Sequence, residues 1–461
     1  MARQPMPDVV VLLPGILGSV LRRHREVVWG YGAASIGKAL LTLGRSMERN
    51  LALPHDDPTR DDLGDEIVAD ALMPDLHLIP GFWKIDGYTR LAEALAAGFE
   101  LRDGENFFSF PYDWRRDNRV ASRKLGRVTS DWLASWRQSS GNAQAKLILI
   151  AHSMGGLICR HFLECSGGWE NTRVLVTFGT PYRGSLNALD MLANGVKKGP
   201  FDMSNVARQF TAIYQLLPVF ECYDGGDGKL VRVGETTGIP NVDAARAAAA
   251  LAFHHEIESA VATNRNLPAH QHAGPRVYPV VGIAQQTSLS ARRDGDKLTM
   301  LQTYQGKPLA GDGTVPRVSA IPLEMSDAPA AMYAGTQHGS LQNADAVLVH
   351  LAGVLSGLSI DLGSFMKPKI TVALEVEDLF LPGEPISVRA RPSQETALTA
   401  TLSRHGDTAS LASMDMIPGP DAWFEVTFSS LIGGAYRVTV GGSGVEEAED
   451  AFAVVEPGEI S

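Results

Sequence analysis

A serine between an expected strand and an expected helix is the strongest chemical feature of this sequence. Ser153 lies in Ala151-His152-Ser153-Met154-Gly155-Gly156, after the apolar run Lys146–Ile150 and before a helix-like stretch, Leu157 to Cys165. This is the context of a nucleophile elbow, in which a strained turn lifts the serine hydroxyl above a sheet. Small neighbours let the helix pack closely on the strand. The alternative is a glycine-containing turn with an incidental serine.

Two later residues, Asp312 and His338, could supply the acid and the base that a serine nucleophile needs. In the fold that carries such an elbow, the chain order is serine, acid, histidine. Asp312 in Ala310–Pro316 and His338 in Gly335–Ser340 follow in that order. Taken alone, a Gly-Asp-Gly turn is more often structural. Their order and their shared sheet edge predict a triad of Ser153, Asp312 and His338.

Fixed N–H donors must also hold the negative charge that develops on the substrate oxygen. We predict that one donor is the backbone of Met154, directly after the nucleophile, and that the other is the backbone of Ile16. Ile16 lies in the glycine-punctuated turn Leu13–Ser19, after the first expected strand. Read alone, that turn is equally consistent with an ordinary strand-to-loop connection.

The remaining chemistry-bearing residues favour structural interpretations. In Phe110–Arg116 we expect a buried Asp113–Arg115 pair that braces the sheet, because a catalytic role would need a second acid. Solvated or packed roles suffice for His152, His254, His255 and His350. The sequence has no phosphate-binding or dinucleotide-binding glycine loop and no cluster of His and Cys ligands, so we predict neither a cofactor nor a metal.

Length and charge limit the classes of partner. A chain of 461 residues suits two or three domains. The net charge of −11 argues against nucleic acid, which needs a basic face, and against electrostatic recruitment to anionic membranes. Any contact with lipid would therefore be apolar.

Targeting signals and cysteines bear on location. No stretch reaches the roughly 18 consecutive apolar residues that span a bilayer, and we recognise no secretory signal. Cys159, Cys165 and Cys222 give neither a paired framework nor metal-ligand spacing. We therefore expect reduced thiols in a cytoplasmic protein.

The first 365 residues read as an α/β domain, because short β-rich runs alternate with helical stretches. Nearly continuous apolar runs are typical of parallel strands that helices cover on both faces. The expected strands are Val9–Leu13, Asn106–Pro111, Lys146–Ile150, Arg173–Phe178, Val277–Ile283 and Ala331–Ala334.

Two regions interrupt this alternation, and we interpret both as insertions over the functional edge of the sheet rather than as additional scaffold. The lid is expected at about residues 22–80. The cap is expected at about residues 185–275, with a helix from Asp243 to Asn264 that Asp243 caps. A second helix is expected to place these residues on one face and to end at Pro218: Val206, Phe210, Ile213, Leu216 and Leu217.

From about residue 366 to residue 461 the pattern changes to an alternation of period two. Turn signals such as Pro382-Gly383-Glu384-Pro385 and Gly433-Gly434 separate the runs. Short strands at this spacing predict a small all-β sandwich, immunoglobulin-like in type. The expected strands lie around Ile370–Val376, Ile386–Ala390, Leu398–Leu402, Phe424–Phe428 and Tyr436–Val440.

Taken in order, the motifs of residues 8–355 resemble the lecithin:cholesterol acyltransferase family, which includes lysosomal phospholipase A2 and phospholipid:diacylglycerol acyltransferases. The matching segments are Leu13–Ser19, Pro80-Gly81-Phe82, Pro111–Arg115, Ala151–Gly156, Gly179-Thr180-Pro181, Gly311–Val315 and Gln337-His338.

The resemblance implies an α/β-hydrolase fold with cap and lid insertions. It also implies Ser153 as nucleophile, Asp312 as acid and His338 as base, with the backbones of Ile16 and Met154 at the oxyanion positions. It further implies a lid around Pro80–Trp83, a cap at Tyr214–Pro218, and hydrolysis or transfer of lipid acyl chains. The implied partners are a lipid or acyl-ester substrate and, through the lid, a transient membrane contact.

The chain departs from the family pattern in three ways, namely the missing secretory signal, the missing cysteine pairs and the added C-terminal β-domain. These departures leave the location and the physiological substrate open. The alternative function is a non-catalytic binding protein on a hydrolase scaffold, with the β-sandwich as its interaction module. A third possibility is that the sandwich docks the enzyme to a protein partner or to a carbohydrate.

Overall fold

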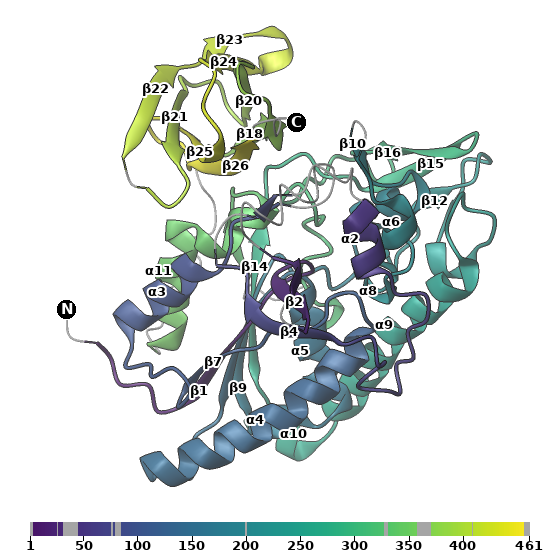
Figure 1. Ribbon diagram of the computed structural model, residues 1–461, viewed down its shortest axis with the longest axis vertical. Coiled ribbons are helices and arrows are strands. Elements are labelled where there is room, and N and C mark those ends of the chain that lie inside the picture. Colours follow the sequence, from purple (N-terminus) through teal and green to yellow (C-terminus); the bar gives the residue numbers. More distant parts are fainter. Residues whose placement is uncertain are drawn as a thin grey trace.

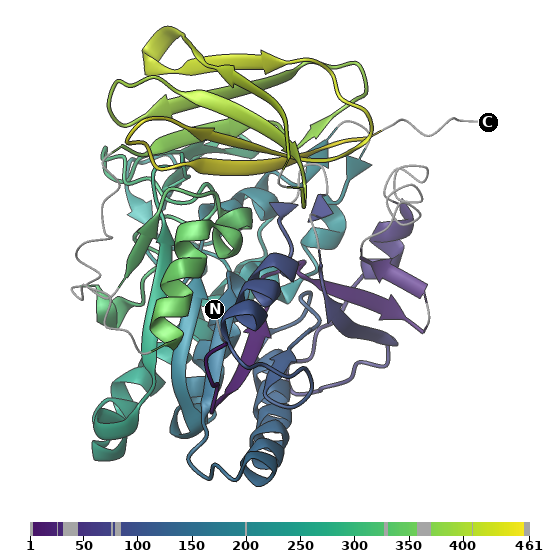
Figure 2. The same ribbon diagram turned by 90° about the vertical axis from the view of Figure 1, so that its left-hand side faces the viewer.

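The computed structural model describes residues 3–24, 26–30, 45–74, 77–78, 84–198, 201–326, 331–356, 370–407 and 409–455. These residues form two units with separate hydrophobic cores. The larger core lies within residues 6–355, and a smaller one lies within residues 372–454. The smaller unit sits over one end of the larger one (Figures 1 and 2).

A six-stranded sheet forms the centre of the larger unit. Its order is β17-β14-β9-β8-β1-β7, and every neighbouring pair is parallel. The strands are β1 Val9–Leu13, β7 Phe107–Ser109, β8 Leu147–His152, β9 Thr172–Phe178, β14 Arg276–Gly282 and β17 Met332–Ala334. Each lies within two residues of a predicted run. The apolar runs identified them because strands such as β8 are buried at every position.

The chain order in this sheet reverses between β1 and β8. After β1 the chain adds β7 on one side and then returns to add β8, β9, β14 and β17 on the other. In open parallel sheets, ligands bind at the carboxyl ends of the strands where the order reverses. The turns after β1 and β8 therefore occupy the position expected of a site.

Helices cover both faces of the sheet (Figure 1). One layer contains α4 Asn118–Ser140, α5 Met154–Cys165, α9 Ala244–Asn264 and α10 Pro268–Ala273, and the other contains α3 Thr89–Gly98 and α11 Asp345–Leu355. The expected cap of α9 is present, because the Asp243 side chain accepts a hydrogen bond from the Arg246 N–H. This is the predicted α/β-hydrolase fold. None of the helices in the described ranges has both the length and the apolar character to cross a membrane.

The lid region is more regular than predicted where the structure describes it. A three-stranded antiparallel sheet of order β3-β2-β4 and a short helix occupy part of it. The elements are β2 Ser19–Arg23, β3 Glu26–Trp29, α2 Arg45–Leu51 and β4 Ile67–Leu72. The segment Pro80–Trp83, expected to be the lid itself, lies outside the described residues.

The prediction of one continuous amphipathic helix before Pro218 is wrong. Its residues are buried, but they form two short helices, α7 Ser204–Ala207 and α8 Thr211–Tyr214. Phe210 between them is extended, with φ −78° and ψ 115°. The Arg246 side chain of α9 donates to the carbonyls of Arg208 and Gln209 at 2.5 and 2.8 Å. A tertiary partner thus replaces the helical hydrogen bonds at the break.

The rest of the predicted cap region contains a helix and two short strands, β12 and β13, which join β15 and β16 from beyond residue 275 in a four-stranded sheet of order β13-β12-β15-β16. These elements are α6 Leu186–Ala193, β12 Tyr223–Asp224, β13 Leu230–Val231, β15 Ser290–Asp294 and β16 Lys297–Leu301.

The C-terminal unit is a β-sandwich of two sheets. One has the order β18-β20-β24-β23 and the other β19-β26-β25-β21-β22. The strands are β18 Val372–Val376, β19 Leu379–Phe380, β20 Ile386–Pro392, β21 Thr399–Arg404, β22 Ser410–Asp415, β23 Ile417–Pro418, β24 Phe424–Phe428, β25 Gly434–Gly441 and β26 Ala448–Val454. Alternate side chains of both sheets form one core. The β-sandwich is as predicted, and its immunoglobulin-like type stays a prediction.

Candidate active site

Ser153 occupies a strained turn between β8 and α5. Its backbone has φ 52° and ψ −124°, a region that non-glycine residues rarely enter. Two hydrogen bonds hold it there: the Ser153 N–H donates to the Phe178 carbonyl at 2.8 Å, and the Thr180 hydroxyl donates to the Ser153 carbonyl at 2.9 Å. A Cβ on Gly156 would lie 2.0 Å from the Thr180 oxygen, so this turn requires glycine at that position.

The Asp312 carboxylate is buried and accepts three hydrogen bonds. Its Oδ1 atom accepts from the N–H groups of Thr314 at 2.9 Å and Val315 at 2.6 Å. Its Oδ2 atom lies 2.7 Å from His338 Nδ1. Because both backbone donors point at Oδ1, they fix which oxygen faces the histidine. Sequence reasoning missed these donors, although both lie within three residues of Asp312.

The His338 ring joins Asp312 to Ser153. Nδ1 must donate, because an ionised carboxylate can only accept, and in the neutral ring Nε2 then carries the lone pair. Nε2 lies 2.9 Å from Ser153 Oγ. The His338 N–H also donates to the Asp312 carbonyl at 2.8 Å. The structure therefore brings the three predicted side chains together, in the tautomer that a general base requires.

The two predicted oxyanion donors come from segments that adjoin Ser153. Met154 follows it directly, and Ile16 lies in the turn after β1. That turn packs closely on the nucleophile, since a Cβ on Gly15 would lie 2.9 Å from Ser153 Cβ. Within the described part of the chain, the N–H groups of Ile16 and Met154 donate to no other group. Both are thus available to a substrate oxygen.

A buried hydrogen-bond chain that the sequence did not predict connects this turn to the base. The Gly15 N–H donates to the Tyr88 hydroxyl at 2.8 Å, and that hydroxyl lies 3.0 Å from His152 Nδ1. His152 Nε2 lies 3.1 Å from the His338 carbonyl. Burial, and next the nearby His338 ring, lower the pKa of His152 to about 3. The ring is therefore neutral, with Nε2 donating to the carbonyl and Nδ1 accepting from Tyr88.

His152 was expected to have only a solvated or packed role. It belongs instead to a network that ties together the turn after β1, the elbow and the loop of His338. A polar side chain at the buried end of β8 needs buried partners. That requirement was the available sequence signal, but it does not identify Tyr88 as the partner.

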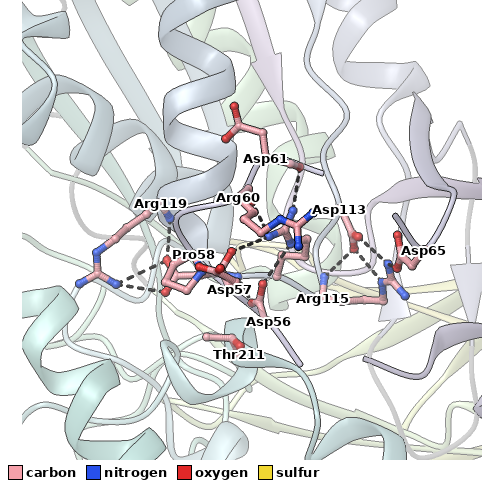
Figure 3. Close-up of polar contacts among 12 residues, drawn as sticks. Asp56, Asp57, Pro58, Arg60, Asp61, Asp65, Asp113, Arg115, Arg119 and Thr211 are labelled. Atoms are coloured by element: carbon pink, nitrogen blue, oxygen red, sulfur yellow. Dashed lines mark hydrogen bonds and ion pairs between the residues drawn. The ribbon is translucent and has the colours of Figure 1, made fainter. Parts of the chain in front are cut away.

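The predicted Asp113–Arg115 pair is present and is part of a larger cluster (Figure 3). Arg115 is fully buried and pairs with Asp113 at 2.6 Å and with Asp65 at 2.7 Å. Arg116 pairs with Asp56 and donates to the carbonyls of three residues: Asp57, Arg60 and Asp61. The pairs therefore brace the segment of residues 56–65 against the loop after β7, which is a structural role.

The cap touches the loop of Asp312. The Ser185 hydroxyl donates to the Thr314 carbonyl at 2.5 Å, and the Ser185 N–H donates to the Leu216 carbonyl at 2.8 Å. Within the expected cap segment Tyr214–Pro218, Tyr214 to Leu217 are buried. The cap therefore packs against the acid loop beside the candidate site.

Three ligand-type side chains gather away from this site, on α5 and α9. The ligand atoms of His161, Cys165 and Glu256 lie within 4.8 Å of one another. However, Glu256 already pairs with Arg119 at 2.7 Å. Burial, and next the charge of Glu256, raise the pKa of the Cys165 thiol to about 12. We interpret this group as an ion-pair cluster, because an ion would have to displace Arg119.

Known proteins resemble the segment around the elbow. Residues 83–243 match the model of the lecithin:cholesterol acyltransferase family. The phosphatidylcholine-sterol acyltransferase of Gallus gallus is 28% identical over 149 residues, which cover 29% of this chain and 35% of the relative. A phospholipase A(1) of Arabidopsis thaliana is 27% identical over 106 residues, which cover 22% of this chain and 23% of the relative. The chain thus spans about a third or less of these relatives' lengths.

A comparison of solved structures gives weaker likenesses. The mature lipase BlEst2 of Bacillus licheniformis covers 77% of this chain and 95% of its own, at 13% identity and a TM-score of 0.33. That score is too low to support an inference about activity. The family model includes Ser153, whereas Ile16, Asp312 and His338 lie outside the matched residues. The resemblance that the motifs predicted is therefore confirmed, and residues 83–243 of this chain carry the pattern of the lecithin:cholesterol acyltransferase family.

Proposed function

We propose that this chain is a serine hydrolase of the lipase or phospholipase type, which cleaves acyl esters of lipids through an acyl-serine intermediate. The observation that carries the proposal is the unbroken line from Asp312 through His338 to Ser153, with heavy-atom distances of 2.7 and 2.9 Å. The likeness of residues 83–243 to acyltransferases and a phospholipase supports a lipid ester as the substrate.

In the first half of the proposed reaction, Ser153 Oγ attacks the ester carbonyl carbon while its proton moves to His338 Nε2. The carbonyl oxygen becomes negative and accepts hydrogen bonds from the N–H groups of Ile16 and Met154. When this intermediate collapses, the bond to the leaving alcohol breaks. The alcohol takes the proton from Nε2, and the acyl group stays on Ser153.

In the second half, His338 Nε2 takes a proton from water while the water oxygen attacks the carbonyl carbon of the acyl-serine. The bond from that carbon to Ser153 Oγ then breaks, Oγ takes the proton back from Nε2, and a fatty acid is released. Asp312 stabilises the imidazolium that forms in both halves. An acceptor alcohol in place of the water would give acyl transfer by the same steps. We propose hydrolysis as the main outcome, with transfer where an acceptor alcohol reaches a site from which water is excluded.

Ser153→Ala tests this proposal. We expect it to abolish hydrolysis of phospholipid vesicles and of a short-chain ester, and to abolish labelling by a fluorophosphonate probe, while the melting temperature stays near that of the wild type. Ser166→Ala, which removes a serine at the far end of α5, is the matched control and should keep full activity. Lipid profiling of the wild-type products by mass spectrometry would identify the ester that is cleaved.

The alternative, a non-catalytic binding protein, makes the opposite prediction. It requires that the fluorophosphonate probe does not label the wild type and that the wild type hydrolyses no ester. Undiminished hydrolysis by Ser153→Ala would refute the assignment of the nucleophile instead.

We further propose a cytoplasmic location and a transient apolar contact of the lid with membranes. The three cysteines stand as free thiols, two of them buried, which supports a reducing compartment. In the lid region Val68 is 59% exposed, which supports an apolar contact there. Cell fractionation and co-sedimentation with neutral phosphatidylcholine vesicles test the two proposals separately.

A further inference from the structure

The β-sandwich, which lies over the larger unit (Figure 2), bonds to it at Gln285 and at Gln337 in the loop that carries His338. Strand β18 makes the central contacts through its backbone. The Leu374 N–H donates to the Gln285 side-chain oxygen at 3.0 Å, and the Gln285 amide nitrogen donates to the Val372 carbonyl at 3.0 Å. The Gln337 amide nitrogen donates to the Leu374 carbonyl at 2.8 Å. Gln337 directly precedes His338.

Gln285 links the acid loop, the base loop and the sandwich. Its backbone pairs with Gly311 in both directions, with N···O distances of 3.0 and 3.1 Å, and Gly311 directly precedes Asp312. Its side-chain nitrogen also donates to the Gly335 carbonyl at 2.5 Å. The residue is 1% exposed, so each of these bonds forms away from water. One buried residue thus bonds the acid loop through its backbone, and the base loop and β18 through its side chain.

Other residues of the sandwich lie close to the base loop on both sides of His338. On one side, the Glu446 carboxylate lies against Gly335, where an added Cβ would be 3.1 Å from Glu446 Oε2. On the far side, the Asp86 N–H donates to the Gly339 carbonyl at 2.9 Å. The Asp86 carboxylate in turn pairs with two residues of the sandwich, Arg437 at 2.6 Å and His405 at 2.9 Å.

The loops need such partners because of their position in the sheet. His338 follows β17, which is an edge strand, so no neighbouring strand of the central sheet can bond the backbone beyond it on that side. Buried backbone groups that lack a partner are costly. The Gln285 side chain supplies such a partner to the Gly335 carbonyl, and strand β18 in turn bonds the amides of Gln285 and Gln337.

We propose that Gln285 and Gln337 are positioning residues, which together with β18 hold the acid and base loops in the geometry that catalysis needs. The sandwich is then part of the active-site scaffold, not an appendage. The inference rests on the proposed function and adds to it what orients Asp312 and His338. A displacement of about 1 Å at a reacting group can cost roughly a hundredfold in rate.

Gln285→Met and Gln337→Met test the inference in the full chain. Methionine keeps most of the side-chain volume and removes every hydrogen bond of the amide. We expect kcat for a short-chain ester to fall about tenfold in Gln337→Met and further in Gln285→Met, which loses three bonds. KM should change less than about twofold, because neither side chain contacts the substrate. The rate of fluorophosphonate labelling should fall in parallel with kcat.

Phe428→Leu is the matched control. Phe428 lies in the sandwich core on β24, away from the interface, so this variant lowers the stability of the sandwich without removing a bond to the loops. It should have a lower melting temperature and an unchanged kcat. A merely structural role of the interface predicts instead that all three variants lose activity only as far as they lose folded protein.

The outcomes separate this inference from the proposed function. If the wild type neither labels nor hydrolyses esters, the proposed function fails, and the inference fails with it. If the wild type is active and both glutamine variants keep its kcat and labelling rate, only the inference is overturned. If Gln285→Met does not fold, the kcat of Gln337→Met relative to Phe428→Leu decides.

Discussion

Asparagine in place of Asp312 would give His338 the wrong tautomer. Two backbone donors, the N–H groups of Thr314 and Val315, point at Oδ1, and His338 Nδ1 lies against Oδ2. An asparagine side chain has one oxygen and one NH2 group. Its oxygen must stay where Oδ1 was, because an NH2 group there would oppose two N–H donors. The NH2 group then faces His338 Nδ1.

That orientation makes Nδ1 an acceptor and moves the ring proton to Nε2, where it points at Ser153 Oγ. The base then has no lone pair for the serine proton. To restore the active tautomer, the amide must flip and leave two buried donors unsatisfied, at about 1–3 kcal/mol each. The total of roughly 2–6 kcal/mol corresponds to a factor of about 30 to 10⁴ in rate. In serine proteases the same substitution lowers kcat about 10⁴-fold.

We therefore expect Asp312→Asn to lower kcat for a short-chain ester by about 10³–10⁴ with little change in KM. The melting temperature should change little, since the bonds to Thr314 and Val315 persist. Asp312→Ala is the informative companion. It offers Nδ1 no NH2 group, so the ring can keep its active tautomer, but it leaves both backbone donors without an acceptor. It should be less stable than Asp312→Asn and yet retain more activity.

Two results would contradict this reasoning. An Asp312→Asn enzyme within about tenfold of the wild-type kcat would mean that the carboxylate does not set the tautomer. An Asp312→Ala enzyme that is slower than Asp312→Asn, at equal folded fraction, would mean that the charge matters and the tautomer does not.

Two further predictions follow from buried polar groups. Tyr88→Phe removes the hydroxyl that accepts from the Gly15 N–H and lies against His152. We expect kcat to fall about tenfold, and the free energy of unfolding to fall by about 1–3 kcal/mol for each group left unpaired. If steady-state kinetics and urea unfolding show both values unchanged, the network does not hold the site. Burial lowers the pKa of His254 to about 4, whereas a histidine in the unfolded chain has a pKa near 6.5. Between pH 4 and pH 6.5, the unfolded chain therefore binds more protons at this residue than the folded chain does. Stability should therefore fall as pH drops from about 6.5 towards 4, by up to about 1.4 kcal/mol per unit from this residue; His254→Gln should flatten that slope in urea unfolding at pH 7 and pH 5, and an unchanged slope would refute the assignment.

The central sheet could be predicted from sequence because its signals are local. A strand that helices cover on both faces is a nearly unbroken apolar run, and Leu147–Ile150 has that form. The elbow adds small residues at fixed places, because a Cβ on Gly156 would collide with Thr180. Chain order predicted that Ser153 and His338 meet, because the parallel strands before them end at one edge. Asp312 comes to that edge through the pairing of Gly311 with Gln285, beyond the end of β14.

Other elements could not be predicted because distant residues decide them. The residues from Val206 to Leu217 have helical spacing, yet Arg246 binds the carbonyls at the break and two short helices form. Strands β22 and β26 were not predicted. Strand β22 is largely exposed, and β26 carries Glu449 and Asp450 within its run, so neither shows a clear apolar alternation.

Three of the interactions that hold the candidate site share one property, and it explains why no motif revealed them. Thr180, His152 and Gln285 each direct a side chain to a backbone carbonyl in another loop, namely those of Ser153, His338 and Gly335. A carbonyl is present at every position, so the residue that receives such a bond carries no sequence signature. Only the donor side chain can be recognised in the sequence, and a lone buried polar residue does not indicate which carbonyl it bonds. Sequence can thus identify the reacting groups of such a site, whereas the residues that fix their geometry become visible only in the folded chain.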